Sequence, residues 1–99
     1  MTYKVEFPEF DLGGIEIPAG FEDSSWHNDA SPCWINVERR MCLWVDWPNA
    51  ADREHPTMSR FVITRTDEEG QHTDSMFAAF ESDNYNELIA WLSDSAKTA

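Results

Sequence analysis

Apolar and polar residues alternate most regularly in the middle of the chain. Residues 33–38 (CWINVE) and 41–47 (MCLWVDW) are rich in β-branched and aromatic side chains, and two arginines separate them. In the second run, apolar side chains at the odd-numbered positions share one face, because successive strand residues point to opposite faces. The pattern predicts an antiparallel hairpin, with Ile35 and Val37 on the apolar face of its first strand.

A second pair of β-rich runs follows a connection of about a dozen residues, 48–59, which contains two prolines. Residues 60–66 (RFVITRT) are typical of a strand, residues 67–70 (DEEG) of a turn, and residues 72–81 (HTDSMFAAFE) of a returning strand. We expect this second hairpin to extend the same sheet.

The C-terminal segment changes from an alternating to a helical pattern. Ser82, Asp83 and Asn84 are helix-capping residue types, and Glu87 follows Asn84 by three positions. The apolar stripe of the expected helix consists of Tyr85, Leu88, Ile89 and Leu92. This spacing predicts a helix over residues 84–95 that packs its stripe on one face of the sheet.

The first 25 residues are rich in proline, glycine and acidic side chains, with short extended candidates at 3–7 and 15–17. The predicted fold is α+β: an antiparallel sheet of about four strands with one C-terminal helix packed on one face. We expect a single domain over 1–99, made of an acidic N-terminal arm (1–25), the sheet (33–81) and the helix (84–95).

Composition favours a folded, acidic protein. With 41% hydrophobic and 13% aromatic residues, the 99-residue chain can bury one core, although its net charge is -12. No segment approaches the roughly 20 apolar residues of a membrane span, and the N-terminus lacks a signal-peptide pattern, so we expect a cytoplasmic protein. Strong negative charge disfavours nucleic acids and anionic membranes as direct partners and favours a basic protein surface.

The charge is concentrated at the two ends of the chain. Residues 1–23 contain six acidic residues and one lysine, and residues 67–99 contain eight acidic residues and one lysine. Residues 24–66 contain five acidic residues and five arginines, so the centre is neutral. Two segments of a single sign produce a field that can steer a basic partner, whereas solubility alone requires only mixed charges.

The chain contains residue types used in catalysis and metal binding, but not at the spacings of the known motifs. The possible zinc ligands are Cys33, Cys42, His27, His55 and His72, but none of them forms a zinc-binding motif. A small cysteine enzyme is a further alternative: its nucleophile would be Cys33 or Cys42, its base His27 or His55, and its orienting group Asp29. We expect both cysteines to be free thiols and expect no catalytic residue, metal or cofactor.

The chain contains five tryptophans, most of which we expect in the core because an indole buries a large apolar area. Trp34 and Trp44 are the candidates for the face opposite Leu43 and Val45. If the helix covers only one face, these two rings would be exposed and could anchor a partner.

In its length, its charge and its expected sheet-plus-helix build, the chain resembles small phage-encoded inhibitor proteins, in particular anti-CRISPR proteins of the DNA-mimic type. The resemblance implies that carboxylates occupy the Lys/Arg channel of a type I Cascade and block target DNA. If the protein is phage-encoded, it would act in the cytoplasm of a bacterial host, and we expect a monomer. We expect the binding residues to be Asp67, Glu68, Glu69, Asp74, Glu81, Asp83 and Glu87. The alternative is an interaction or adaptor domain that binds through exposed tryptophans.

Overall fold

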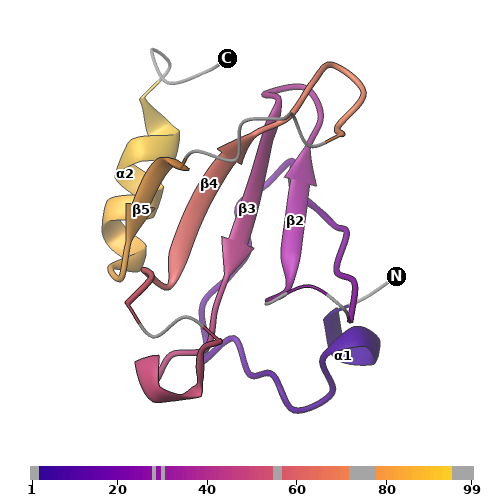
Figure 1. The fold of residues 1–99 in the computed structure, drawn as a ribbon. Coiled ribbons are helices and arrows are strands. Elements are labelled where there is room, and N and C mark those ends of the chain that lie inside the picture. The colour runs from indigo at the N-terminus through magenta and orange to yellow at the C-terminus, as the bar shows by residue number, and fades with distance from the viewer. Residues whose placement is uncertain (1–2, 28, 30, 55–56, 72–77, 95–99) are drawn as a thin grey trace.

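The computed structural model describes residues 3–27, 29, 31–54, 57–71 and 78–94. Within these residues, five strands form one antiparallel sheet in the order β1-β2-β3-β4-β5, so each strand pairs with its neighbours in sequence (Figure 1). The strands are β1 (Glu22–Asp23), β2 (Cys33–Asn36), β3 (Met41–Val45), β4 (Phe61–Arg65) and β5 (Ala78–Ser82). The prediction of an α+β fold with an antiparallel sheet and a C-terminal helix is confirmed, and the sheet has five strands where about four were expected.

Both predicted hairpins are present. In the first, Arg40 has a positive φ of 55° and donates its N–H to the carbonyl oxygen of Val37, which closes the turn between β2 and β3. In the second, Asp67 Oδ1 accepts the N–H groups of Glu69 and Gln71 and so holds the turn after β4. The expected returning strand began at residue 72; residues 72–77 lie outside the described residues, and β5 begins at Ala78.

The pairing register assigns the tryptophans to faces. Trp34 pairs directly with Leu43, and Leu43 pairs with Ile63, so these three side chains share one face. The expectation that Trp34 lies opposite Leu43 is therefore wrong: Trp34 is only 4% exposed and belongs to the core. Trp44 lies on the opposite face, as expected.

The same register corrects the assignment of the first strand. Ile35 pairs with Cys42, so it lies on the face of Trp44 rather than on the core face. Val37 lies in the turn after β2 and is 49% exposed. Residues of the first run do alternate between two faces, but the face that packs on the core is the one with Trp34. A shift of one residue in the register exchanges the two faces, so the alternation alone does not determine which one is buried.

Helix α2 (Tyr85–Ser93) covers part of the core face, where Leu88 and Leu92 are buried. The side chain of Asn84 caps the helix by accepting the N–H groups of Asn86 and Glu87, which stabilises its first turn by about 1 kcal/mol. The predicted helix is confirmed with this cap, and it ends at Ser93.

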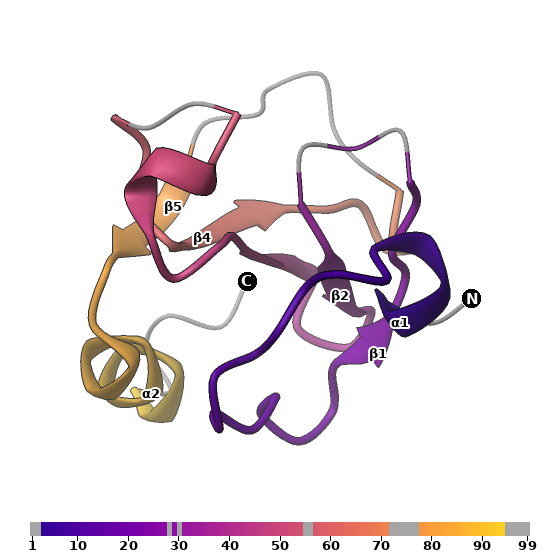
Figure 2. The same cartoon turned by 90° about the horizontal axis from the view of Figure 1, so that it is seen from below.

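The N-terminal arm covers the rest of the core face, on the same side of the sheet as α2 (Figure 2). The predicted extended segment at 3–7 is wrong, because Tyr3–Glu6 forms a one-turn helix, α1, closed by a 2.8 Å hydrogen bond from Phe7 N to Tyr3 O. A helical turn directs Tyr3 and Phe7 to the core and leaves Val5 exposed. Residues 15–17 pack on the core without forming a strand.

The core lies between the sheet and this layer of arm and helix. Its buried side chains are Phe10, Trp34, Met41, Leu43, Val45, Phe61, Ile63, Leu88 and Leu92. Full burial of a side chain of this kind stabilises the fold by about 1.5–3 kcal/mol. None of the helices in the described ranges has the length and apolar character needed to cross a bilayer.

Candidate functional site

The structure places the expected binding residues at two ends of the molecule. Asp67, Glu68 and Glu69 form the turn that follows the last residue of β4. Asp83 accepts the backbone N–H of Arg60, which immediately precedes β4. A five-residue strand spans about 15 Å, so the two groups cannot act as one compact patch. Glu81 lies on β5 and Glu87 on α2, at the same end of the molecule as Asp83. Asp74 lies outside the described residues.

Three of these acids have structural partners. Asp67 holds its own turn, and Asp83 accepts hydrogen bonds from Arg60 N at 2.8 Å and from Arg53 Nη1 at 3.2 Å. Glu87 accepts a hydrogen bond of 2.6 Å from the hydroxyl of Ser82. These contacts account for three of the acidic residues without reference to a partner.

Glu68 and Glu69 adjoin a second source of acidic residues. Gly70, with φ of 83°, lies against the side chains of Val37 and Ile35, where an added Cβ would be 3.1 and 3.4 Å from their Cγ2 atoms. This contact places the turn over the β1–β2 edge of the sheet. An open pocket of about 200 Å³ lies at the same edge. Its lining residues are Gly20, Glu22, Ile35, Asn36, Val37 and Glu38.

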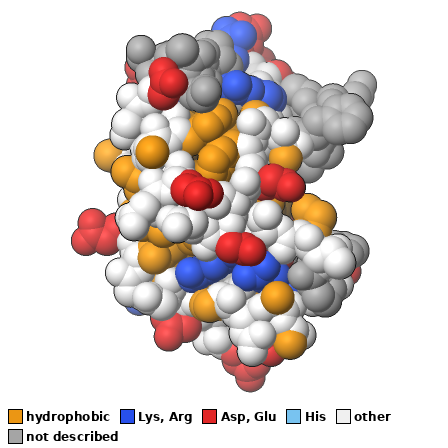
Figure 3. All heavy atoms as spheres, turned by 90° about the vertical axis from the view of Figure 1, so that its left-hand side faces the viewer, with side chains coloured by type: hydrophobic (Ala, Val, Ile, Leu, Met, Phe, Trp, Pro, Cys, Tyr) orange, Lys and Arg blue, Asp and Glu red, His pale blue; other side chains and the backbone are white. Residues whose placement is uncertain are grey.

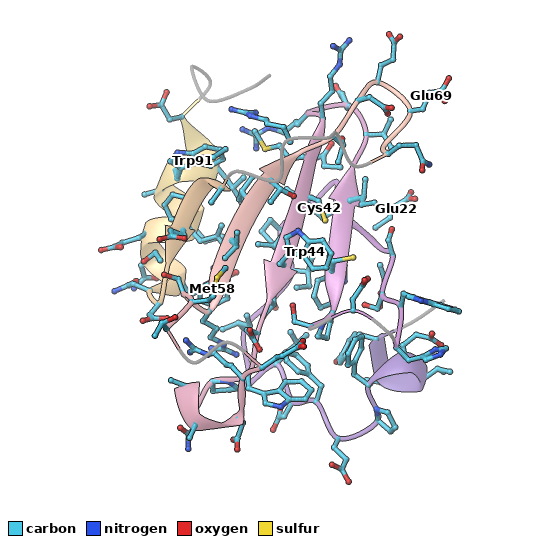
Figure 4. The ribbon with its side chains drawn as sticks, viewed as in Figure 1. Glu22, Cys42, Trp44, Met58, Glu69 and Trp91 are labelled. Atoms are coloured by element: carbon cyan, nitrogen blue, oxygen red, sulfur yellow. The ribbon has the colours of Figure 1, made fainter. Side chains whose placement is uncertain are left out.

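We call Glu22, Glu38, Glu68 and Glu69, together with the apolar side chains Ile35 and Val37, the edge surface. Figure 4 shows Glu22 and Glu69 on the same side of the molecule, beside β2. All four carboxylates are exposed. Arg40 approaches Glu68 at 3.8 Å, but both side chains are more than half exposed, so this pair is weak. Among the described residues, Glu22, Glu38 and Glu69 form no ion pair.

The edge surface joins the two acidic ends of the sequence in part. Glu22 comes from the acidic N-terminal segment, and Glu68 and Glu69 come from the acidic C-terminal one. Glu22 and Glu38 were not among the residues expected from the sequence, because their proximity to the turn depends on the pairing of β1 with β2. The two-residue strand β1 has no alternating pattern that would reveal this pairing.

The side of the molecule formed by α2 and β5 has a different character. Figure 3 shows its Asp and Glu side chains separated from one another by uncharged surface, with two groups of Lys and Arg side chains and exposed hydrophobic atoms among them. A phosphate-like array requires closely and regularly spaced charges. The described residues of this side form no such array, which leaves the edge surface as the better candidate.

The two cysteines lie diagonally across β2 and β3 on the face that carries Trp44. Figure 4 shows Cys42 and Trp44 on this face. Both are free and buried, and Cys33 Sγ contacts the carbonyl oxygen of Ser24 at 3.4 Å. The hydrogen bond with Cys33, followed by burial, raises the pKa of Cys42 far above its ordinary value. A thiol in this state is a poor nucleophile.

His27, a candidate base of the alternative cysteine enzyme, is paired with a glutamate rather than with a thiol. His27 places Nδ1 3.0 Å from Glu6 Oε1, and no hydrogen bond in the described part of the chain joins a thiol to a histidine. Within the same ranges, no group of three or more His, Cys, Asp or Glu side chains is arranged to hold a metal ion. His55 and His72 lie outside the described residues.

Comparisons with protein-family models, with curated proteins and with solved structures find no match to this chain.

Proposed function

We propose that this protein is a non-enzymatic inhibitor that binds a basic, nucleic-acid-binding protein surface and thereby competes with nucleic acid. The observation that carries the proposal is the edge surface, where four exposed glutamates from three chain segments surround two apolar side chains. Protein interfaces commonly combine a small apolar centre with a polar rim. The glutamates would form that rim.

The electrostatics support a basic partner. The net charge of -12 includes glutamates at the edge surface that lack a counter-charge among the described residues. Lysines and arginines of a partner would replace the counterions of these carboxylates, just as they do when they bind phosphates. Such a surface accelerates association with a basic partner and repels nucleic acid.

The resemblance to anti-CRISPR proteins supplies a specific target to test, namely a type I Cascade. Its DNA channel is the kind of Lys/Arg-rich groove that the edge surface complements. In this proposal the protein acts in the bacterial cytoplasm as a monomer, requires no cofactor, and blocks the entry of target DNA.

A competition assay tests this function. Purified protein is added to Cascade with fluorescently labelled target DNA, and DNA binding is followed by anisotropy at increasing salt concentration. We expect inhibition that weakens as salt rises, because exposed charges are screened. Absence of competition at low salt would contradict the proposal.

A charge-reversal pair locates the binding surface. The variant Glu22→Lys with Glu69→Lys should weaken inhibition about ten-fold, because each exposed ion pair contributes up to about 1 kcal/mol. The matched control is Glu16→Lys with Glu54→Lys, which changes the net charge equally at exposed positions outside the edge surface. Equal losses in the two variants would show that total charge acts rather than this surface.

A second candidate function, an interaction domain that binds through tryptophan, rests on Trp26. This side chain is 43% exposed and stacks on His27 with ring centroids 4.2 Å apart, whereas Trp34 is buried. Under this alternative, Trp26→Ala would reduce partner binding more than the double reversal, with little dependence on salt.

A further inference from the structure

A second pocket, separate from the edge surface, is lined by residues of the N-terminal arm and of the connection after β3. The ribbons of these two segments lie at the lower end of Figure 1. Its volume is about 360 Å³, within the range of small-ligand sites. The lining residues are Glu9, Asp11, Trp47, Pro48 and Asp52. We call it the Trp47 pocket.

The aromatic wall of this pocket is held rigidly. Phe10 packs against the indole of Trp47 at a centroid distance of 4.3 Å, and Phe7 meets it edge-on at 6.3 Å. Arg53 donates hydrogen bonds to the carbonyl oxygens of Trp47 and Pro48, at 2.8 and 3.2 Å. The indole is therefore fixed before any ligand arrives, so little side-chain entropy is lost on binding.

The pocket also has three acidic side chains that form no ion pair with the described residues. Glu9, Asp11 and Asp52 are exposed, and no lysine or arginine of the described chain forms an ion pair with any of them. Arg60 lies close enough to Asp11 to interact electrostatically, but its guanidinium donates to the carbonyl oxygens of Leu12 and Asp46. Arg53 is buried and is likewise occupied by carbonyl oxygens.

The geometry points to a binding site for a guanidinium group in the Trp47 pocket. A planar guanidinium stacks on an indole and donates paired hydrogen bonds to carboxylates, which matches one aromatic wall with three acidic side chains. A compact ammonium would also be attracted to the carboxylates, but it has no planar surface that could stack on the indole. The group belongs either to an arginine of a partner protein or to a free small guanidine, and the chemistry recognised is the same.

Titration with small probes tests the site without the inhibitor's target. Indole N–H signals of the full-length protein are followed by NMR, with Trp47 assigned by a Trp47→Phe variant. The probes are N-acetyl-arginine amide, its uncharged isostere N-acetyl-citrulline amide, N-acetyl-lysine amide and the singly charged small guanidine propylguanidine. We expect saturable shifts of Trp47 with the arginine derivative, weaker binding of the lysine derivative, and no saturable shift with citrulline.

The choice between the two sources follows from the same titrations. Tighter binding of propylguanidine than of N-acetyl-arginine amide assigns the site to a free small guanidine, and the reverse order assigns it to a partner's arginine, since both probes carry a single positive charge. Equal shifts with arginine and citrulline overturn the proposal, as does the absence of saturable shifts with every guanidinium probe.

Single variants that neutralise one acidic side chain test whether arginine binds in the Trp47 pocket. Asp52→Asn should weaken arginine binding about five-fold, since an exposed ion pair is worth about 1 kcal/mol. Glu54→Gln, an exposed acid just beyond the pocket, should leave it unchanged. Glu9→Gln provides an independent second variant if Asp52→Asn disturbs the fold. Equal weakening by Glu54→Gln would overturn the assignment to this pocket.

Discussion

The hydroxyl of Tyr85 donates a 2.6 Å hydrogen bond to the backbone carbonyl oxygen of Glu16, 69 positions earlier in the chain. This bond joins the first turn of α2 to the N-terminal arm, so the two elements that cover the core face also hold each other. Tyr85→Phe should lower the free energy of unfolding by about 1 kcal/mol, measured by urea denaturation, while the ring keeps its packing on Phe61.

Tyr3→Phe is the matched control, because the hydroxyl of Tyr3 has no hydrogen-bond partner among the described residues. Its removal should change stability by less than about 0.5 kcal/mol. A larger loss in Tyr3→Phe than in Tyr85→Phe would contradict the role given to the Tyr85–Glu16 bond.

Two glycines with the same backbone conformation allow the cost of backbone strain to be separated from the cost of a steric contact of the added Cβ. Gly70 and Gly14 have φ of 83° and 84°, but an added Cβ would lie 3.1 Å from Val37 at Gly70 and would meet nothing within 4 Å at Gly14. Gly14→Ala should cost about 1 kcal/mol from backbone strain alone. Gly70→Ala should cost about 2 kcal/mol and also displace the edge surface. Equal losses in thermal denaturation would refute the close contact.

Arg53 ties the connection after β3 to the rest of the fold. Its side chain is 4% exposed and donates to the carbonyl oxygens of Trp47, Pro48 and Met58. Arg53→Met would leave these acceptors without their donor, and we expect a loss of about 3 kcal/mol in urea denaturation.

Asp83→Asn provides the comparison for Arg53→Met. Asp83 is 71% exposed, and asparagine retains an oxygen for Arg60 N, so the loss should stay below about 1 kcal/mol. If Asp83→Asn proved as damaging as Arg53→Met, the ion pair rather than the carbonyl contacts would hold this region.

The sequence predicted those elements whose own pattern determines them. The alternation in β2 and β3, the turn at Asp67 and the cap at Asn84 each depend on neighbouring residues, and the structure contains all of them. The face of Trp34 depends instead on the register across two strands, which the four-residue turn between them decides. Local alternation leaves that choice open.

The arm and the candidate site were harder to predict for the same reason. The alternating residues 3–7 resemble a strand, but tertiary contacts of Tyr3 with Trp34 and Phe10 accompany a helical turn. One turn has little intrinsic stability, so packing rather than propensity decides its conformation. Glu22 joins the edge surface through pairing at residues distant in sequence, which no local pattern contains.

Acid should loosen the attachment of α1. Glu6 accepts hydrogen bonds from the backbone N–H of His27 and contacts its ring, and the side-chain contact lowers the pKa of Glu6 below its ordinary value of 4.5. Because the pKa of Glu6 is lower in the folded state than in the unfolded state, ionised Glu6 stabilises the fold fully above pH 4.5. This stabilisation is lost as the pH falls through the pKa of the folded state. Wild type should therefore lose stability with acid more steeply than Glu6→Gln.

Urea midpoints measured from about pH 6 to pH 3 on both proteins provide the test. Other carboxylates titrate in both, so the difference between the two curves isolates Glu6. Parallel curves would show that the contact with His27 contributes nothing.

Burial predicts that neither thiol reacts in the folded protein. Cys33 and Cys42 are buried on one face of the sheet, and their mutual hydrogen bond together with burial raises the pKa of Cys42, so the reactive thiolate is scarce. Modification by a disulfide reagent should be at least about 100-fold slower than in urea, because it requires opening of the sheet. The variants Cys33→Ser and Cys42→Ser each retain one thiol, so the modification rate of each variant belongs to the remaining cysteine. Rapid modification of Cys33 in the native Cys42→Ser variant would contradict its burial and restore the cysteine-enzyme alternative.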